Sequence, residues 1–324
     1  MKKLAVIGLG NISTRHRKNL KKLYPRSTII AMSASGRSPK TQPPDSDIVV
    51  RNITDIIAHK PDMVIVASPA TFHAQHAVPL IESGIPVLIE KPIAASLEEA
   101  RKINQAFQSY KTPVAIGYCL RYLPSSQKVN SVIQSKTIGK LHNILVEVGQ
   151  YLPDWRANTN YKDSVSASSS LGGGALLELS HEIDYTQWIA GQLIPQTAIL
   201  RSSAELNLDV EDSADILSIN EDGAVISMHL DFLQRHPYRR CRFIGSEATL
   251  EWDLISNSVI LYQADETRTL LNDPSWDKNQ MYLNMILDFE NMILNTPNNC
   301  ISPVEAMSTL SFIEKVKELN TNRL

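Results

Sequence analysis

The sequence of 324 residues predicts two domains, an α/β domain at 1–119 followed by an α+β domain at 120–324. The first part alternates short, continuous apolar runs with helical patterns, which is typical of a parallel sheet covered by helices on both faces. The second part holds several runs of strand length. These runs lie at 141–148, 214–219, 224–230, 240–244 and 249–252. A chain of this length suits two cores better than one.

The composition is that of an ordinary soluble protein, with 43% apolar and 20% charged residues. The net charge of -2 offers no electrostatic attraction to nucleic acid or to an anionic membrane. Cys119, Cys241 and Cys300 lie far apart, and neither a disulfide framework nor a zinc spacing follows from them. No apolar run has the length of a signal-peptide core or of a transmembrane helix. We therefore expect a cytoplasmic protein without a nucleic acid, membrane or metal partner.

The first apolar run, 4–7, leads into Gly8-Leu9-Gly10 and then into a helical pattern. A strand, a glycine turn and a helix in this order indicate a dinucleotide site. Gly8 permits the tight turn, and Gly10 lets the backbone approach a pyrophosphate. The alternative is a turn with a purely structural role.

Asn11 and Ile12 begin this helix, whose first N–H groups attract phosphate. Ser13 replaces the third glycine of the fingerprint and is small enough for close packing. The basic cluster from Arg15 to Lys22 is expected on the solvated face of the helix, where it could help to hold phosphates.

The second strand, 28–32, ends in a segment without an acidic residue. An NAD site usually has a carboxylate there to bind the ribose diol. Ser33, Ser35 and Arg37 instead suit a 2′-phosphate, which favours NADP, with NAD as the alternative. If so, Arg37 binds the cofactor; otherwise it is a surface loop residue.

A short strand at 47–50 and a helix at 53–58 precede the buried strand 61–67, which ends in Ser68-Pro69. Ligands of open α/β sheets bind at the carboxyl ends of the strands, so both residues are candidate cofactor contacts. His73 begins the following helix. It either contacts the cofactor or serves in packing and capping.

The next strand, 85–89, ends in Glu90-Lys91-Pro92, and the last strand of this domain follows at 114–118. Lys91 at the end of a buried strand can orient a hydroxyl through its ammonium group. Glu90 and Lys91 are also candidate cofactor contacts. The alternative for Lys91 is a surface lysine. The bond from Lys91 to Pro92 is a candidate cis peptide.

These motifs, continued by Gly117 to Tyr122, occur in the order seen in the Gfo/Idh/MocA oxidoreductases, and the chain resembles that family over nearly its whole length. The resemblance implies an N-terminal Rossmann domain that binds NAD(P). It also implies a C-terminal α+β domain for substrate binding and oligomerisation, built on an open, mostly antiparallel sheet. An open sheet needs cover, so we expect a homodimer or homotetramer formed through it. A terminal helix at about 303–319 carries an apolar stripe and is expected to pack back on the first domain.

The second part resembles a branch of the family found with bacterial surface-polysaccharide and sialic-acid-type sugar genes. The resemblance rests on Tyr151 to Arg156, Tyr161 and Gly172 to Tyr185. It implies a sugar or nucleotide-sugar substrate and a role in polysaccharide biosynthesis. Trp155, Arg156 and Tyr161 are candidate substrate contacts. Arg121 is either a further substrate contact or a structural ion-pair partner.

A helix is predicted at 177–189, with Glu178, His181 and Asp184 on one face because they are spaced by three. A histidine suits proton exchange at a carbinol oxygen, and a carboxylate can fix its tautomer. The resemblance places His181 on the family's catalytic histidine and the usual aspartate on Glu178. Inositol-dehydrogenase-like members place that aspartate four residues before the histidine, whereas Glu178 lies three before it.

Either Glu178 or Asp184 therefore supports His181, or Lys91 and His181 act alone. The alternative for His181 is a hydrogen-bonded core histidine. We expect an NAD(P)-dependent dehydrogenase or reductase that acts on the CH–OH group of a sugar-like alcohol or on its ketone. The alternatives are a redox-neutral sugar-modifying enzyme with a tightly bound cofactor and a non-catalytic protein that senses NADP.

Overall fold

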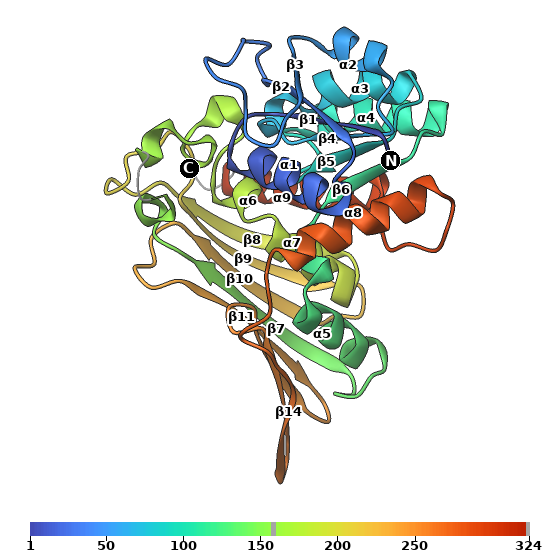
Figure 1. The fold of residues 1–324 in the computed structure, drawn as a ribbon. Helices are drawn as coiled ribbons and strands as arrows, with labels where there is room; N and C mark the ends of the chain where they lie inside the picture. Colours follow the sequence, from blue (N-terminus) through green and yellow to red (C-terminus); the bar gives the residue numbers. More distant parts are fainter. Residues whose placement is uncertain (157–159, 322–324) are drawn as a thin grey trace. The chain divides into compact units, whose positions relative to one another are not determined.

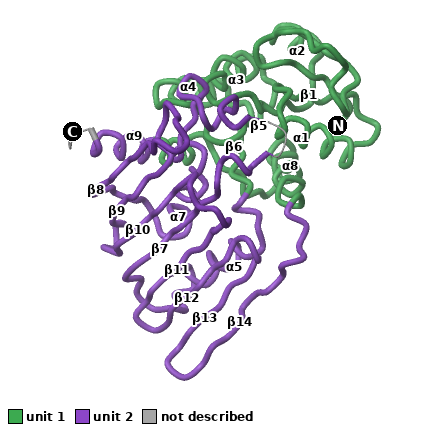
Figure 2. Tube along the Cα trace, turned by 90° about the vertical axis from the view of Figure 1, so that its left-hand side faces the viewer, with its two compact units in different colours: residues 1–119, 279–310 green, residues 120–278, 311–324 purple. Residues whose placement is uncertain are grey.

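The computed structural model describes residues 1–156 and 160–321 and divides into two compact units. Unit 1 comprises Met1–Cys119 and Asn279–Leu310, and unit 2 comprises Leu120–Lys278 and Ser311–Leu324 (Figure 2). The chain passes from one unit to the other after Cys119. Residues 279–302, which lie beyond the expected domain boundary at 119/120, also group with unit 1, as does the start of the terminal helix.

Unit 1 is built on a parallel sheet of six strands in the order β3-β2-β1-β4-β5-β6. The strands are β1 (Lys3–Ile7), β2 (Thr28–Met32), β3 (Ile48–Val50), β4 (Met63–Val66), β5 (Val87–Glu90) and β6 (Val114–Gly117). Helix α1 (Asn11–Leu23) lies on one face with α8 (Gln280–Ile293). Helices α2 (Ile53–His59), α3 (His73–Glu82) and α4 (Leu97–Tyr110) lie on the other (Figure 1). Because both faces are covered, the central strands are almost entirely buried, and the predicted Rossmann domain is confirmed.

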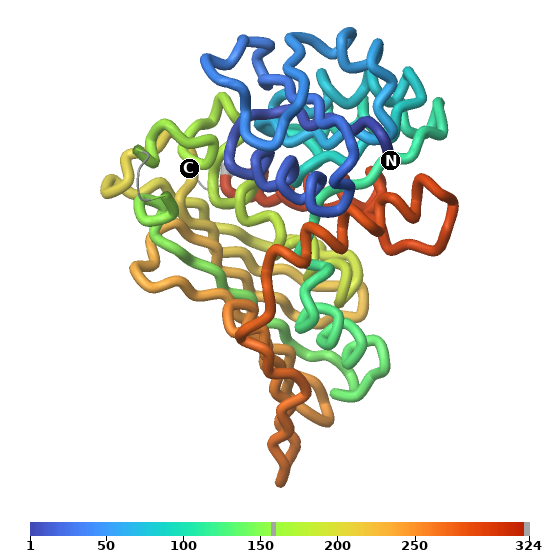
Figure 3. Tube along the Cα trace, viewed as in Figure 1, coloured from blue at the N-terminus to red at the C-terminus, as the bar shows by residue number. Residues whose placement is uncertain are grey.

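The returning segment 279–310 is held to unit 1 by contacts between residues far apart in the sequence. Helix α8, orange-red in Figure 3, runs beside the blue α1. The hydroxyl of Tyr24 donates to Glu290 Oε2 at 2.7 Å, and the amide of Ile116 donates to the carbonyl of Ile301 at 2.9 Å. Helix α9 (Pro303–Thr321) begins in unit 1 and ends in unit 2. No local sequence pattern predicts that this segment packs on unit 1, because each contact joins residues more than 180 positions apart.

Unit 2 is built on a sheet of eight strands in the order β14-β13-β12-β11-β7-β10-β9-β8. The strands are β7 (Leu141–Gly149), β8 (Leu193–Arg201), β9 (Ser213–Asn220), β10 (Val225–Asp231), β11 (Tyr238–Gly245), β12 (Thr249–Asp253), β13 (Ser258–Gln263) and β14 (Glu266–Asn272). Among the described residues β10 and β7 are parallel, and the other neighbouring strands are antiparallel. The predicted open, mostly antiparallel sheet is confirmed. Strands β8, β13 and β14 are not among the predicted runs.

The helices of unit 2 lie between its strands in the sequence. They are α5 (Pro124–Gln134), α6 (Ala175–Glu178) and α7 (His181–Ala190). The shorter 3₁₀ helices are η2 (Cys119–Tyr122), η3 (Leu152–Trp155), η4 (Tyr161–Asp163), η5 (Val165–Ala167) and η6 (Ser169–Leu171). Within residues 1–156 and 160–321, no helix combines the length and apolar character needed to cross a membrane.

The inner face of the second sheet is apolar. Its central row is buried and consists of Ala198, Ile216, Met228, Val146, Cys241 and Trp252. The ring of Trp252 packs edge to face against Tyr185 of α7 at 4.8 Å, and its Nε1 donates to Ser125 Oγ of α5 at 2.8 Å. Helices α5 and α7 therefore cover this face.

The outer face of the second sheet carries charged residues at the alternate positions, as the period of two requires. One row across six strands consists of Ile199, Asp215, His229, Glu147, Arg240 and Asp253. His229 lies between two carboxylates: its Nδ1 is 2.6 Å from Asp215 Oδ1, and its Nε2 is 2.8 Å from Asp231 Oδ2. The hydrogen bond to Asp231 is the largest contribution that raises the pKa of His229 to about 9.

We expect the stability of unit 2 to depend on pH through His229. Its pKa in the folded protein, about 9, exceeds the ordinary value of 6.5, so the stabilisation is complete below pH 6.5 and is lost as the pH rises through 9. His229→Gln removes this titration. Thermal unfolding at pH 6.5 and at about pH 9.5 should show a larger loss of Tm for the unmodified protein than for the variant. Equal losses in both proteins would contradict the assignment.

Candidate active site

In unit 1 the candidate residues gather at one edge of the parallel sheet. Gly8, Ser33, Ser68 and Lys91 follow β1, β2, β4 and β5, which are neighbours in the sheet and run in the same direction. Their carboxyl ends therefore meet at one edge, where open α/β sheets bind ligands.

The glycine turn after β1 is shaped by a close approach to the end of β4. Gly8 has φ 115°, and a Cβ on it would lie 2.4 Å from both the carbonyl oxygen of Ala67 and Ser13 Oγ. Ser13 is fully buried, and its hydroxyl donates to the same carbonyl at 3.0 Å. Serine is accepted at the third position of the fingerprint because it is small and its hydroxyl has a partner.

The start of α1 fits a pyrophosphate. Gly10 is its N-cap residue, and no side chain of the described residues caps the helix. A Cβ on Gly10 would meet no described heavy atom within 4 Å. The N–H groups of Asn11 and Ile12 thus begin a helix whose first turn carries no acidic residue. Such a helix end attracts an anion.

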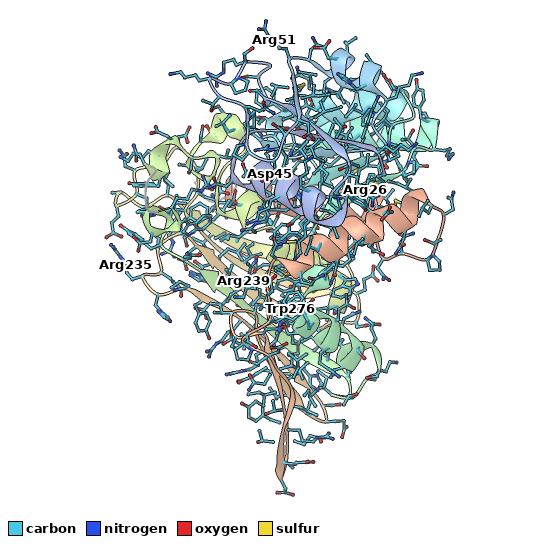
Figure 4. The ribbon with its side chains drawn as sticks, in the orientation of Figure 1. Arg26, Asp45, Arg51, Arg235, Arg239 and Trp276 are labelled. Atoms are coloured by element: carbon cyan, nitrogen blue, oxygen red, sulfur yellow. The ribbon has the colours of Figure 1, made fainter. Side chains whose placement is uncertain are left out.

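The basic cluster on α1 differs from the expected solvated face, because His16 and Arg17 are buried. The guanidinium of Arg17 donates to the carbonyls of Gly8 at 3.2 Å and Pro44 at 2.8 Å. Burial lowers the pKa of Arg17, and Asp45, labelled in Figure 4, opposes this. Arg17 thereby ties the glycine turn to the segment after β2. The helical spacing of residues 13, 16, 17 and 20 was the signal for this buried face.

The segment after β2 is exposed and contains hydrogen-bonded hydroxyls. Arg37 Nε donates to Ser35 Oγ at 2.9 Å, and the hydroxyl oxygens of Ser33 and Ser35 lie 3.4 Å apart. The segment 33–37 thus presents a guanidinium and two hydroxyls and contains no carboxylate.

The loop after β4 is held by two buried histidines of α3. Ser68 Oγ lies 3.0 Å from His76 Nδ1. Burial, followed by the neighbouring His73, lowers the pKa of His76 to about 4, so His76 is neutral at pH 7. The ring nitrogens of His73 lie 2.8 Å from the carbonyl oxygen of Ser68 and 2.9 Å from that of Pro92. This geometry corresponds to the packing alternative for His73. Pro69 is the N-cap residue of η1 (Ala70–Phe72).

Glu90-Lys91-Pro92 ends β5 with a buried carboxylate. Glu90 Oε1 lies 2.6 Å from His16 Nε2, and Glu90 Oε2 accepts from the backbone N–H of Lys91 at 3.3 Å. Gly117 faces Glu90 on β6, and a Cβ there would lie 3.3 Å from the Glu90 carboxyl carbon. Lys91 is half-buried, and its peptide bond to Pro92 is cis.

In unit 2 the triple glycine forms a tight turn before α6. Gly172 and Gly174 have positive φ, 79° and 102°. A Cβ on Gly173 would lie 2.4 Å from the carbonyl oxygen of Val165, and one on Gly174 would lie 2.5 Å from Glu211 Oε1. Glu211 Oε1 also accepts from the N–H of Leu176 at 3.1 Å. The glycines therefore allow the chain to pass close to two other segments.

The prediction of one continuous helix at 177–189 is wrong. Glu178 ends α6 and His181 begins α7, with Leu179 and Ser180 between them. The first turns of α7 are fixed by ion pairs of buried carboxylates. One of them joins Glu182 to Arg239, labelled in Figure 4, with distances of 2.6 and 2.9 Å. Glu178 and His181 are half-buried, whereas most of their neighbours are buried.

The second ion pair joins two residues that the sequence analysis proposes for other roles. Arg121 Nε donates to Asp184 Oδ2 at 3.0 Å, and its Nη2 donates to Asp184 Oδ1 at 2.7 Å. Both residues are buried, and the guanidinium carbon lies 5.5 Å from the centre of the Trp188 ring. This arrangement corresponds to the structural alternative for Arg121.

The remaining substrate candidates lie together in unit 2. Trp155, Arg156 and Tyr161 line one small pocket. The indole of Trp155 donates to the carbonyl of Gln150 at 3.1 Å, and the hydroxyl of Tyr161 donates to that of Leu206 at 3.1 Å. Arg156 is exposed. No group of three or more metal-ligating side chains is arranged to hold an ion in the part of the chain that the structure describes.

Comparison with curated proteins gives partial matches. The rhizopine catabolism protein MocA of Rhizobium meliloti is 31% identical over 138 residues, which are 42% of this chain and 40% of that protein. Matches to two further curated relatives span 48% and 60% of their lengths. The chain thus covers less than two thirds of these relatives.

Comparison with solved structures shows the same fold. Levoglucosan dehydrogenase in complex with NADH and levoglucosan has a TM-score of 0.86 at 17% identity, over 100% of this chain and 98% of that one. The WlbA dehydrogenase from Bordetella pertussis in complex with NADH and UDP-GlcNAcA has a TM-score of 0.82 at 16% identity, over 100% and 96%. At these identities the likeness concerns the fold alone.

Two family models match successive parts of the chain. The model for the oxidoreductase family with an NAD-binding Rossmann fold covers residues 2–118, and the model for the GFO/IDH/MocA C-terminal domain covers residues 126–251. Both of the matched domains have the fold described above. The chain belongs to the Gfo/Idh/MocA oxidoreductase family.

Proposed function

We propose that the protein is an NADP(H)-dependent oxidoreductase that acts on the CH–OH group of a sugar or nucleotide sugar, or on the corresponding ketone. The observation that carries this proposal is the half-buried Lys91 at the same sheet edge as the uncapped start of α1. Gly8, Gly10, Asn11 and Ile12 would hold the pyrophosphate of the dinucleotide. The nicotinamide supplies the chemistry of accepting or donating the hydride.

Lys91 and His181 have separate roles in this proposal. The ammonium of Lys91 donates a hydrogen bond to the substrate oxygen and stabilises the charge that develops there. His181 takes the proton of the carbinol oxygen in the oxidation and returns it in the reduction. Glu178 orients the imidazole. We assign this role to Glu178 because both carboxylate oxygens of Asp184 accept hydrogen bonds from Arg121.

An anionic substrate group is supported by Arg156 in unit 2. Its exposed guanidinium suits a group such as the phosphate of a nucleotide sugar, and Trp155 and Tyr161 lie beside it around a small pocket. The structural neighbours were solved with levoglucosan and with UDP-GlcNAcA, which are a sugar and a nucleotide sugar.

We expect Lys91→Ala and His181→Asn to lower kcat by roughly 100-fold or more, because each removes a group that acts on the substrate oxygen. Turnover is measured as the absorbance change of the nicotinamide with a panel of sugars and nucleotide sugars. Glu178→Gln should lose more activity than Asp184→Asn in the fraction that remains folded. Lys128→Ala, at an exposed lysine of α5, is the control.

Full activity of Lys91→Ala would contradict the proposed role of the lysine. Conversion of sugar without net change in the nicotinamide absorbance would instead favour the redox-neutral enzyme.

Arg37 is proposed to select NADP. Arg37→Ala should weaken NADPH binding by roughly 10-fold or more, because a charge-assisted hydrogen bond to the 2′-phosphate is lost, and should leave NADH binding nearly unchanged. Fluorescence titration with both cofactors measures this. Arg26→Ala is the matched control, since Arg26 is an exposed arginine outside the segment 33–37 (Figure 4). Tighter binding of NADH than of NADPH by the unmodified protein would overturn the assignment.

We also propose that the outer face of the second sheet binds a second copy of the chain. Leu145, Ile194, Ile199 and Leu217 are 43%, 45%, 50% and 41% exposed on strands β7, β8 and β9. The charges beside them are already paired across the strands, as in Arg240 with Asp253 at 2.9 Å. A face with balanced charge and exposed apolar residues can meet its own copy without strong repulsion.

Leu217→Lys should therefore convert the assembly to monomers, because it places like charges on the two facing copies. Light scattering after size exclusion measures the mass, and NADPH binding reports that unit 1 is intact. A monomeric unmodified protein, or a variant with unchanged mass, would contradict this interface.

A further inference from the structure

Two buried histidines from different helices contact the neighbours of Lys91 in the chain. One contacts Glu90, which precedes the lysine, and the other contacts Pro92, which follows it. On the N-terminal side, His16 of α1 is fully buried, and its Nε2 lies 2.6 Å from Glu90 Oε1. The other oxygen of Glu90 accepts from the N–H of Lys91 at 3.3 Å. His16 therefore reaches the lysine through one carboxylate.

On the C-terminal side, His73 of α3 is 1% exposed. Its Nδ1 lies 2.9 Å from the carbonyl oxygen of Pro92 and 3.3 Å from that of Ile93. Its Nε2 lies 2.8 Å from the carbonyl oxygen of Ser68. The ring of His73 thus lies between the chain just after Lys91 and the loop after β4.

The carboxylate that His16 contacts has little freedom to move. Gly117 of β6 lies close against it: a Cβ there would lie 3.3 Å from the carboxyl carbon and 3.3 Å from Oε2, which is a tight contact. His16 is in turn backed by Tyr282 of α8, whose ring centre lies 5.9 Å from that of the imidazole in an edge contact. The three elements α1, β6 and α8 all belong to unit 1.

We propose that His16 and His73 are positioning residues that together fix the backbone on both sides of Lys91, and so fix the direction in which its side chain leaves the end of β5. We call the two contacts, His16 to Glu90 and His73 to Pro92, the histidine clamp. The inference rests on the proposed function of Lys91. A lysine side chain has four rotatable bonds, so a fixed backbone decides where the ammonium can reach.

The histidine clamp requires that one particular ring nitrogen of His73 carries a proton. Burial lowers the pKa of His73, and the carbonyls of Ser68 and Pro92 and the charge of Glu90 oppose this. A neutral imidazole has one N–H, so it can donate to one of the two carbonyls. The clamp requires this proton on Nδ1, which faces Pro92.

Asparagine and glutamine separate the two contacts, because their amide nitrogens replace Nδ1 and Nε2 respectively. His73→Asn keeps a donor toward Pro92, whereas His73→Gln keeps one toward Ser68 only. For His16, which uses Nε2, His16→Gln keeps the contact with Glu90 and His16→Leu removes it.

The first measurement is hydrogen–deuterium exchange of the full chain without ligand, read on a peptide that contains Lys91. We expect faster exchange in His16→Leu and His73→Gln, and nearly unchanged exchange in His16→Gln and His73→Asn. Tyr24→Phe is the control, because it removes a half-buried hydrogen bond between α1 and α8, to Glu290. Unchanged exchange in His16→Leu and His73→Gln would overturn the clamp.

The second measurement separates positioning from a general loss of structure. His16→Leu and His73→Gln should lower kcat on the order of 10- to 100-fold, as expected for a displaced catalytic group, while the Kd for NADPH stays near that of the unmodified protein. Equal losses of kcat in His73→Asn and His73→Gln, matched by equal losses of Tm, would show a merely structural role and overturn the proposal. Full activity of Lys91→Ala would refute the proposed function, whereas the exchange experiment tests the clamp independently.

Discussion

The buried carboxylate of Glu90 is the constraint on which much of unit 1 depends. A carboxylate removed from water is costly unless hydrogen bonds replace its hydration. Here His16 and the N–H of Lys91 supply them. The need for a partner explains a histidine on the inner side of α1, and a Cβ at position 117 would lie only 3.3 Å from the carboxyl carbon, which favours glycine there. One buried carboxylate thus constrains one residue on a helix and one on a strand, and it connects them to Lys91.

In unit 2, buried carboxylates similarly hold the backbone near His181 in place. The first turn of α7 carries Glu182 and Asp184, both buried, and each is bound by an arginine through two hydrogen bonds. Loss of one partner of such a pair typically costs about 3–5 kcal/mol, because the other charge remains buried. The pairs therefore hold the start of α7, where His181 lies, more firmly than the short helix α6 alone would. The ion pair of Arg121 with Asp184 is one of these two supports of the helix.

The fold was largely predictable, and the failures have physical causes. Continuous apolar runs identified the strands of unit 1, because both faces of that sheet are covered. Strand β14 was missed because most of its residues are exposed and polar. The return of α8 to unit 1 was missed because it depends on contacts such as Tyr24 with Glu290, which no local pattern contains.

Predictions about single side chains were limited in another way. The charges of His16 and Arg17 predict a solvated face, whereas the helical spacing places both residues with the buried Ser13 and Leu20. For His73, sequence alone left cofactor contact and packing equally open. The contacts of its ring depend on which carbonyls the folding of two loops brings to it, and those carbonyls belong to Ser68 and Pro92. The type of a residue does not reveal which backbone groups it will contact.

The family motifs divide into two groups once their contacts are known. Glu90, His73, Gly117 and Gly174 are explained by buried hydrogen bonds or by close approaches of the backbone. Lys91, Glu178 and His181 remain half-buried beside them, at the end of a strand and at the ends of two helices. A side chain that stays partly exposed, on a backbone that buried contacts hold in place, is what a catalytic group requires. This contrast, more than the motif itself, singles out Lys91 among the residues at the end of β5.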